Sequence, residues 1–145
     1  MAVWFGRISG LDGPSELSQG GYDVQLLVGG VKGGTGKSTL AANLGIERAR
    51  HGKKVILVDA DPDQESLSDY IANRDEHGAL PSVPVVQAKG STTAKSLQAL
   101  ARDFDDVIVD CGGFDSIELR QAALISHAWV VPLNPSQCKS GRCPS

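Results

Sequence analysis

A glycine-rich segment separates two very different stretches of this 145-residue chain. The segment runs from Gly29 to Thr39 and reads GGVKGGTGKST, with an apolar, β-branched run before it and an amphipathic stretch of helix length after it. Glycines let successive backbone N–H groups curl around an anion, and the N-terminus of a helix adds partial positive charge. A strand, a glycine-rich loop and a helix in this order predict a phosphate-binding site.

The end of this segment carries the side chains that a nucleotide site needs. Lys37 can reach the terminal phosphates, and the hydroxyl of Ser38 is positioned to bind Mg²⁺. The other candidates for phosphate binding are Gly33, Gly34, Thr35, Gly36 and Thr39. Counting excludes two related patterns, because the ordinary Walker A motif requires glycine at Val31, and the dinucleotide fingerprint started at Gly34 requires Gly or Ala at Thr39.

Two later apolar runs end in aspartates. Asp59 and Asp61 follow the run 55–58, and their spacing places both carboxylates on one face if the strand persists. Asp110 ends the run 107–109 in the form of a Walker B strand, and we predict that it holds Mg²⁺ through a water molecule. Ligand sites in open α/β sheets lie at such strand ends. Helix capping after a strand is the alternative role for each aspartate.

The whole chain alternates between short apolar runs and amphipathic stretches. The expected strands are 24–28, 55–58, 83–86, 107–109 and 129–133, and the expected helices are about 37–51, around 67–71, from 91 to about 104, and 115–126. Gly52 is expected to cap the first helix, and Asp115 with Glu118 is expected to form a capping box on the last. This alternation predicts an α/β fold with a mostly parallel sheet and helices on both faces.

Composition and charge limit the remaining possibilities. We expect a flexible leader at 1–22, a nucleotide-binding domain at 23–136 and a tail at 137–145. The hydrophobic fraction of 41% and the charged fraction of 21% are those of a globular chain, and a net charge of −3 argues against coating nucleic acid by bulk charge. No apolar run approaches the length of a membrane span or follows a secretory pattern, so we expect a cytoplasmic protein.

The stretch 32–39, KGGTGKST, resembles the deviant Walker A motif of the ParA/MinD family of dimeric ATPases, which partition plasmids and chromosomes or position the division machinery. In that family the extra lysine, here Lys32, reaches the phosphates bound by the other subunit. The stretch 59–64, DADPDQ, is similar to the family's D-x-D-P-Q motif, although Asp63 intervenes before the glutamine. The resemblance implies that Asp61 orients the attacking water and that Asp59 supports the Mg²⁺ shell.

The resemblance thus implies ATP and Mg²⁺ as cofactors and an ATP-dependent homodimer as the switch state. The catalytic residues expected in this chain are Lys32, Lys37 and Asp61, and the expected metal-binding residues are Ser38, Asp59 and Asp110. A centromere-binding adaptor is the family's usual partner; DNA binding is possible for the family, and no membrane partner is expected. The resemblance ends near Ser136, whereas family members continue through further elements, so we expect the N-terminal portion of a P-loop NTPase, incomplete at the C-terminus.

Three alternatives to this interpretation are open. One is a truncated nucleotide-binding module that does not turn over. A second is a related metal-cluster carrier, because the stretch 111–114, CGGF, is similar to the Cys-Gly-Gly-Phe of nitrogenase-type iron proteins. A small-molecule kinase is the third, disfavoured because such kinases usually carry the ordinary Walker A motif.

Overall fold

One six-stranded sheet organises the chain in the computed structural model, which describes residues 2–7, 24–30, 34, 36–61, 64, 66–113 and 115–133. The strands are β1 (Ala2–Arg7), β2 (Val24–Val28), β3 (Val55–Ala60), β4 (Val85–Gln87), β5 (Asp106–Cys111) and β6 (Ala128–Leu133). The helices are α1 (Lys37–Arg50), α2 (Ser66–Glu76), α3 (Thr93–Asp103) and α4 (Ile117–Ala123), with a 3₁₀ turn, η1 (Gly90–Thr92), before α3. Apart from β1, the strands and helices lie close to the places that the apolar runs and the amphipathic stretches predict.

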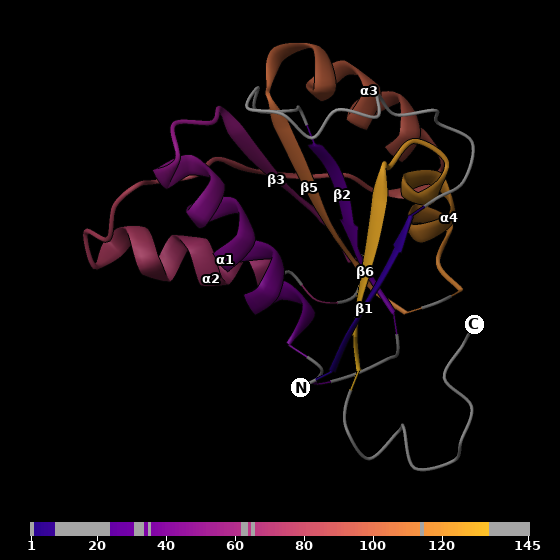
Figure 1. Cartoon of the computed structure of the whole chain (residues 1–145), viewed down its shortest axis with the longest axis horizontal. Coiled ribbons are helices and arrows are strands. Elements are labelled where there is room, and N and C mark those ends of the chain that lie inside the picture. Colours follow the sequence, from indigo (N-terminus) through magenta and orange to yellow (C-terminus); the bar gives the residue numbers. More distant parts are fainter. Residues whose placement is uncertain are drawn as a thin grey trace.

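The strand order is β1-β6-β2-β5-β3-β4. Figure 1 labels the first five of these strands, from β1 to β3. Strands β2 to β6 pair in parallel, and β1 alone pairs antiparallel, with β6. Each helical crossover carries the chain back to the end of the sheet at which the parallel strands begin. The predicted α/β fold with a mostly parallel sheet is confirmed.

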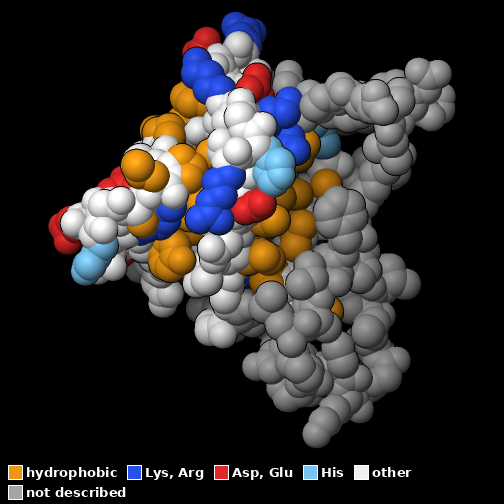
Figure 2. Space-filling view, turned by 60° about the vertical axis from the view of Figure 1, so that its left-hand side comes forward, with side chains coloured by type: hydrophobic (Ala, Val, Ile, Leu, Met, Phe, Trp, Pro, Cys, Tyr) orange, Lys and Arg blue, Asp and Glu red, His pale blue; other side chains and the backbone are white. Residues whose placement is uncertain are grey.

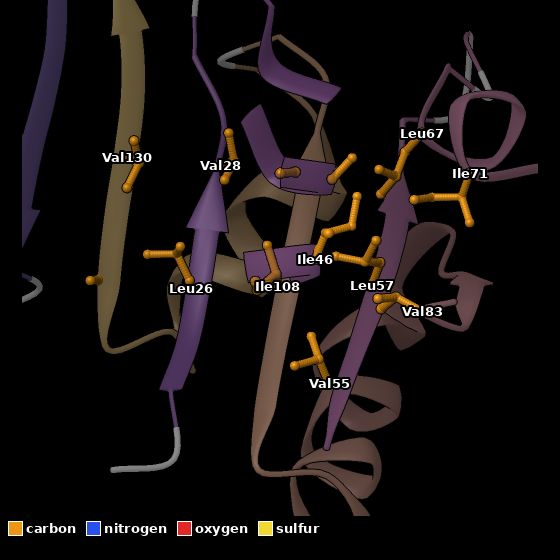
Figure 3. Packing of buried hydrophobic residues seen from close by; sticks show 13 residues of the cluster. Leu26, Val28, Ile46, Val55, Leu57, Leu67, Ile71, Val83, Ile108 and Val130 are labelled. Atoms are coloured by element: carbon orange, nitrogen blue, oxygen red, sulfur yellow. The ribbon is translucent and has the colours of Figure 1, made fainter. Parts of the chain in front are cut away.

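The two faces of the sheet carry separate hydrophobic clusters, because successive strand residues point to opposite sides. On one face Leu26, Leu57 and Ile108 pack with Ile46 of α1 and Leu67 of α2 (Figure 3). On the opposite face Leu27, Val58 and Val109 pack with Leu97 of α3 and Leu119 of α4. Both faces are therefore covered by helices, as Figure 1 also shows and as the alternation predicts.

The amino-terminal strand corrects one expectation. Residues 1–22 show no strand period and are expected to be a flexible leader, yet 2–7 form β1. The backbone of Ala2 pairs with Leu133 and that of Arg7 with Ala128, so the strand is defined by a partner far away in the chain. The other residues of the expected leader, and the tail 137–145, lie outside the described residues.

The ends of the helices agree with the sequence in one case and differ in another. Gly52 adopts φ +80° after α1, and the amides of Gly52 and Lys53 donate to the carbonyls of Ala49 and Arg48, which is the expected glycine C-cap. The expected capping box at α4 is wrong. Ser116, one residue later than Asp115, is the N-cap and accepts from the amide of Leu119 at 3.1 Å.

Glu118, the second member of the expected box, is buried elsewhere. Its Oε1 accepts a hydrogen bond from the amide of Gly90 at 2.7 Å, across the space between α4 and η1. Tertiary packing thus competes with the local cap for this side chain. Among the described helices, none combines the length and the apolarity that a membrane crossing requires.

Candidate nucleotide-binding site

The strands β2, β3 and β5 end side by side at one edge of the sheet. Val28 pairs with Asp110, and Asp59 pairs with Asp110 from the other side. The glycine-rich segment begins directly after Val28 and leads into α1. The structure therefore brings the beginning of the predicted phosphate loop and two of the predicted aspartates together at the carboxyl edge, where α/β sheets bind ligands.

Two described glycines of the loop adopt conformations that favour glycine. Gly34 has φ +60° and Gly36 has φ +76°, both in the left-handed region. Gly36 is the residue before α1, and it provides no side chain to cap the helix. The first turn of α1 also contains no acidic residue, so its positive end is not neutralised from within the helix. The predicted residues Lys32, Gly33 and Thr35 lie outside the described residues.

The first residues of α1 lie beside β5. The side chain of Ser38 hydrogen-bonds the carboxylate of Asp110, which is buried, and the charge of Lys37 acts on the same carboxylate. Thr39, the last candidate of the loop, is exposed. Ser38 and Lys37 are thus brought to Asp110 as the sequence predicts, although their chemical roles stay predictions.

Burial raises the pKa of Asp110 to about 6. The hydrogen bond from Ser38 lowers the pKa, the negative charge of Asp59 raises it, the charge of Lys37 lowers it, and Asp61 raises it further. Desolvation outweighs the favourable contacts, so the charged form of Asp110 is incompletely compensated. A carboxylate in this condition gains from a cation placed next to it.

Asp59 and Asp61 differ in their surroundings, although both belong to the end of β3. Asp59 is only 2% exposed, and its Oδ1 accepts from the amide of Asp61 at 3.3 Å, while its Oδ2 accepts from the amide and the hydroxyl of Ser68 at 3.1 and 3.0 Å. The Asp61 carboxylate is half-buried and accepts from the amide of Gln64 at 3.2 Å.

Asp61 also lies against the chain that follows β5. A Cβ atom placed on Gly112 would come within 3.2 Å of both carboxylate oxygens of Asp61. This position therefore favours glycine, because a side chain here would push the carboxylate of Asp61 aside. The carboxylate of Asp61, which follows β3, thus lies next to the backbone of Gly112, which follows β5.

The residues present fit a magnesium ion. Mg²⁺ prefers oxygen ligands, retains several waters and needs only one or two protein groups. The hydroxyl of Ser38 and the carboxylate of Asp110 are two such groups in contact, and the pKa of Asp110 shows that its charge is undercompensated. Among the described residues no group of three or more His, Cys, Asp or Glu side chains is arranged to hold a metal by itself. A metal here would thus be shared with phosphate oxygens and water.

Cys111 offers little to a metal cluster. It is fully buried as the last residue of β5, and burial raises the pKa of its thiol well above the usual range. Metal clusters are held by thiolates. The geometry of this residue therefore argues against the metal-cluster alternative.

Three contacts at this edge are not evident from the motifs. They are the bonds from Ser68 to Asp59, the close approach of Gly112 to Asp61, and the hydrogen bond between Gly90 and Glu118. A polar residue in the first turn of a predicted helix is a sequence signal for Ser68, because such residues often satisfy helix amides. Glu118 has no such signal, since its partner is 28 residues away.

Comparisons with known proteins agree with this geometry. A model of the "CobQ/CobB/MinD/ParA nucleotide binding domain" family matches residues 26–118. The septum site-determining protein MinD of Synechocystis is 29% identical over 72% of this chain and 50% of the relative. The chromosome partitioning protein ParA of Caulobacter vibrioides is 32% identical over 70% of this chain and 38% of the relative. The chain thus spans half or less of the length of these relatives.

A solved structure agrees as well. The signal recognition particle receptor FtsY from Elizabethkingia anophelis, in complex with GDP, superposes with a TM-score of 0.51 at 26% identity, over 76% of this chain and 36% of that one. The family model covers more than half of the chain and includes the last residues of β2, all of α1, and Asp61 and Asp110. On the matched sequence and the shared fold, the chain belongs to the CobQ/CobB/MinD/ParA nucleotide-binding domain family.

Proposed function

We propose that this chain binds Mg²⁺-ATP at the carboxyl edge of its sheet and hydrolyses it as a ParA-like switch ATPase. One observation carries the proposal: Lys37 and Ser38, at the start of α1, lie beside the buried Asp110, and Asp61 lies at the next strand end. The family membership and the names of the relatives support a nucleotide as the ligand.

Each residue has a distinct part in this proposal. Lys37 and the amides of the loop neutralise the phosphates, because phosphoryl transfer depends mainly on positioning and charge stabilisation. Ser38 and Asp110 would hold Mg²⁺, which when bound supplies further positive charge to the phosphate oxygens. Asp61 accepts a hydrogen bond from the attacking water and orients it. Gly112 leaves the space that Asp61 needs.

The switch itself is proposed from the resemblance. ATP would bring two copies together, with Lys32 of each reaching the phosphates held by the other, so that turnover and dissociation are coupled. The relatives named for chromosome partitioning and septum-site determination make plasmid or chromosome partition, or positioning of a cell structure, the proposed role in the cytoplasm. A centromere-binding adaptor is the proposed stimulator of turnover.

The face of the molecule that carries α1 and α2 shows no basic surface of the kind that binds DNA among its described residues (Figure 2). Figure 2 shows basic and acidic side chains interspersed on the described part of the face that carries α1 and α2. Non-specific DNA binding requires a basic surface that can neutralise several phosphates. The charge pattern of this face therefore does not support DNA binding.

GTP is the second candidate nucleotide, because the FtsY structure that this chain resembles holds GDP. The phosphate loop and the Mg²⁺ ligands do not distinguish between bases. A comparison of hydrolysis with ATP and GTP decides between them. An ATPase should use ATP at least ten times more efficiently.

The test uses the Asp61→Ala variant. We expect it to bind Mg²⁺-nucleotide like the wild type, to lose hydrolysis, and by light scattering to form a dimer with Mg²⁺-ATP but not with Mg²⁺-ADP. The Lys32→Ala change in the same background should abolish the dimer. Unchanged turnover in Asp61→Ala would contradict the catalytic assignment. A wild-type protein that binds nucleotide, stays monomeric and does not hydrolyse it would instead be a binding module without turnover.

A further inference from the structure

The carboxylate of Asp59 bridges the end of β3 and the first turn of α2. Its Oδ1 accepts from the amide of Asp61, and its Oδ2 accepts from both the amide and the hydroxyl of Ser68. Ser68 is the third residue of α2, where amides have no partner within the helix. A negative charge is also favourable at a helix N-terminus. The strand thus supplies a cap to a helix that starts several residues later in the chain.

This arrangement gives both carboxylate oxygens of Asp59 partners within the protein. Asp59 is 2% exposed, and both of its oxygens accept from protein donors of the same loop and helix. A side chain that orients a metal-bound water must turn an oxygen toward that water. The bonds of Asp59 instead point to its own loop, which carries Asp61.

Asp61 is held from three sides. Its amide donates to Asp59, its Oδ1 accepts from the amide of Gln64, and its carboxylate packs against Gly112. A shift of α2 relative to β3 would move Ser68 and so turn the carboxylate of Asp59, which also accepts from the amide of Asp61. Misplacing a reacting group by a fraction of an ångström to one ångström is enough to lower a rate strongly.

We propose that Asp59 and Ser68 form a clamp that positions Asp61 for hydrolysis, with the Ser68 hydroxyl as its specific, removable part. The proposal rests on the proposed function, because it assigns Asp61 to the attacking water. Asp59 and Ser68 are positioning residues, since they act through Asp61. The clamp assigns Asp59 a different task from the support of the Mg²⁺ shell that the family resemblance implies.

The first test is Ser68→Ala, which removes one hydrogen bond to Asp59 and leaves the backbone bond and all charges. We expect the rate constant of hydrolysis to fall about five- to twentyfold, with the affinity for Mg²⁺-ATP unchanged, and Ser68→Thr to restore most of the rate. Ser82→Ala is the matched control, because Ser82 makes the same kind of bond, Oγ to Asp75 Oδ2 at 2.9 Å, beside the other end of α2. Equal rates in Ser68→Ala and Ser82→Ala would overturn the proposal.

The second test separates the clamp from metal binding. In Asp59→Asn the side-chain NH₂ group replaces one acceptor oxygen and faces a hydrogen-bond donor, so one of the bonds to Asp61 or Ser68 is lost. We therefore expect a lower rate constant of hydrolysis with the same half-saturating Mg²⁺ concentration. A half-saturating Mg²⁺ concentration raised tenfold or more, with the rate restored at high Mg²⁺, would show instead that Asp59 serves the metal, and would overturn the clamp.

A third measurement does not depend on turnover. Hydrogen exchange of the amides of Asp61 and Ser68 should be about tenfold faster in Ser68→Ala than in the wild type and unchanged in Ser82→Ala. If the wild type shows no hydrolysis but this difference is observed, the clamp stands and the proposed ATPase activity fails. If the exchange rates do not change, the clamp is wrong whether or not the protein hydrolyses ATP.

Discussion

Strand β5 carries a buried aspartate at each end, and the two have opposite surroundings. Asp106, at the amino end, accepts from the guanidinium of Arg48 through both oxygens and from the amide of Val24 at 3.0 Å. Asp110, at the carboxyl end, is hydrogen-bonded by Ser38 and lies near two other aspartates. Burial is nearly equal, with 0% of Asp106 and 2% of Asp110 exposed.

The difference separates structural from functional charge. The carboxylate of Asp106 raises the pKa of Arg48, chiefly through their hydrogen bond, and the pair joins β5 to the end of α1. At Asp110 the balance is reversed, because desolvation raises its pKa to about 6. One end of the strand is thus closed by internal pairing, while the other is left with charge that a ligand can satisfy. Side chains whose pKa is shifted by burial and by neighbouring charges are typical of functional sites.

Removing the ion pair between Asp106 and Arg48 should have the largest effect on stability. We expect Asp106→Ala to lower the free energy of unfolding by about 2–4 kcal/mol, because it removes the buried carboxylate that pairs with Arg48 and accepts from the amide of Val24. Urea denaturation followed by circular dichroism measures the change. Nucleotide affinity of the folded variant should stay unchanged. A loss below about 0.5 kcal/mol would contradict the structural role.

The same kind of change at the other end should act in the opposite direction. The folded pKa of Asp110, about 6, lies above the ordinary aspartate value of about 3.9, so its ionisation opposes folding as the pH rises between these values. In the absence of Mg²⁺ and nucleotide, Asp110→Asn should stabilise the protein by about 1–3 kcal/mol at pH 8.

This gain should shrink as the pH falls from 6 toward 4, where the wild-type carboxyl is itself neutral. Urea unfolding of both proteins at pH 8 and pH 4.5 tests the sign. The variant should also lose Mg²⁺-dependent nucleotide binding. A variant that is less stable than the wild type at pH 8 would refute the view that Asp110 carries uncompensated charge.

Two glycines extend the comparison to smaller effects. At the amino edge, Gly52 has φ +80° and open space around its Cα, so Gly52→Ala should cost about 1 kcal/mol of stability through backbone strain alone. Thermal melting should detect this loss while hydrolysis by the folded protein stays constant. A decrease in the hydrolysis rate constant would mean that the amino edge also serves the site.

At the carboxyl edge, Gly112→Ala should change stability least and activity most. Its Cβ would lie 3.2 Å from the Asp61 carboxylate, which has to shift by only a few tenths of an ångström, so we expect less than about 0.5 kcal/mol in unfolding free energy. Hydrolysis should fall at least tenfold because Asp61 is displaced. A variant with wild-type turnover would show that the contact between Gly112 and Asp61 does not matter for the reaction.

Much of this architecture could be predicted from the sequence, because the signals are local. The apolar runs that precede Asp59 and Asp110 are buried on both faces of a parallel sheet, so each reads as a continuous hydrophobic strand. Gly34 and Gly36, before Lys37, have a left-handed backbone that few other residues adopt. Such features need no knowledge of distant partners.

The features that escaped prediction depend on distant contacts. Strand β1 exists through pairing with β6, more than a hundred residues away in the chain. At α4, Ser116 is the cap in place of Asp115, and Glu118 bonds to the distant amide of Gly90. The hydrogen bonds from Ser68 to Asp59 could not be predicted, because they join the end of β3 to α2 and Ser68 lies outside the family motif.

The most direct test of this account is a calorimetric titration of the wild type and Lys37→Ala with ATP, in Mg²⁺ and in EDTA. The account predicts binding by the wild type in Mg²⁺, at least tenfold weaker binding in EDTA, and no measurable binding by Lys37→Ala, whose urea unfolding should match the wild type. Equal ATP affinity of the two proteins in Mg²⁺ would contradict the claim that the carboxyl edge of this sheet is a Mg²⁺-ATP site.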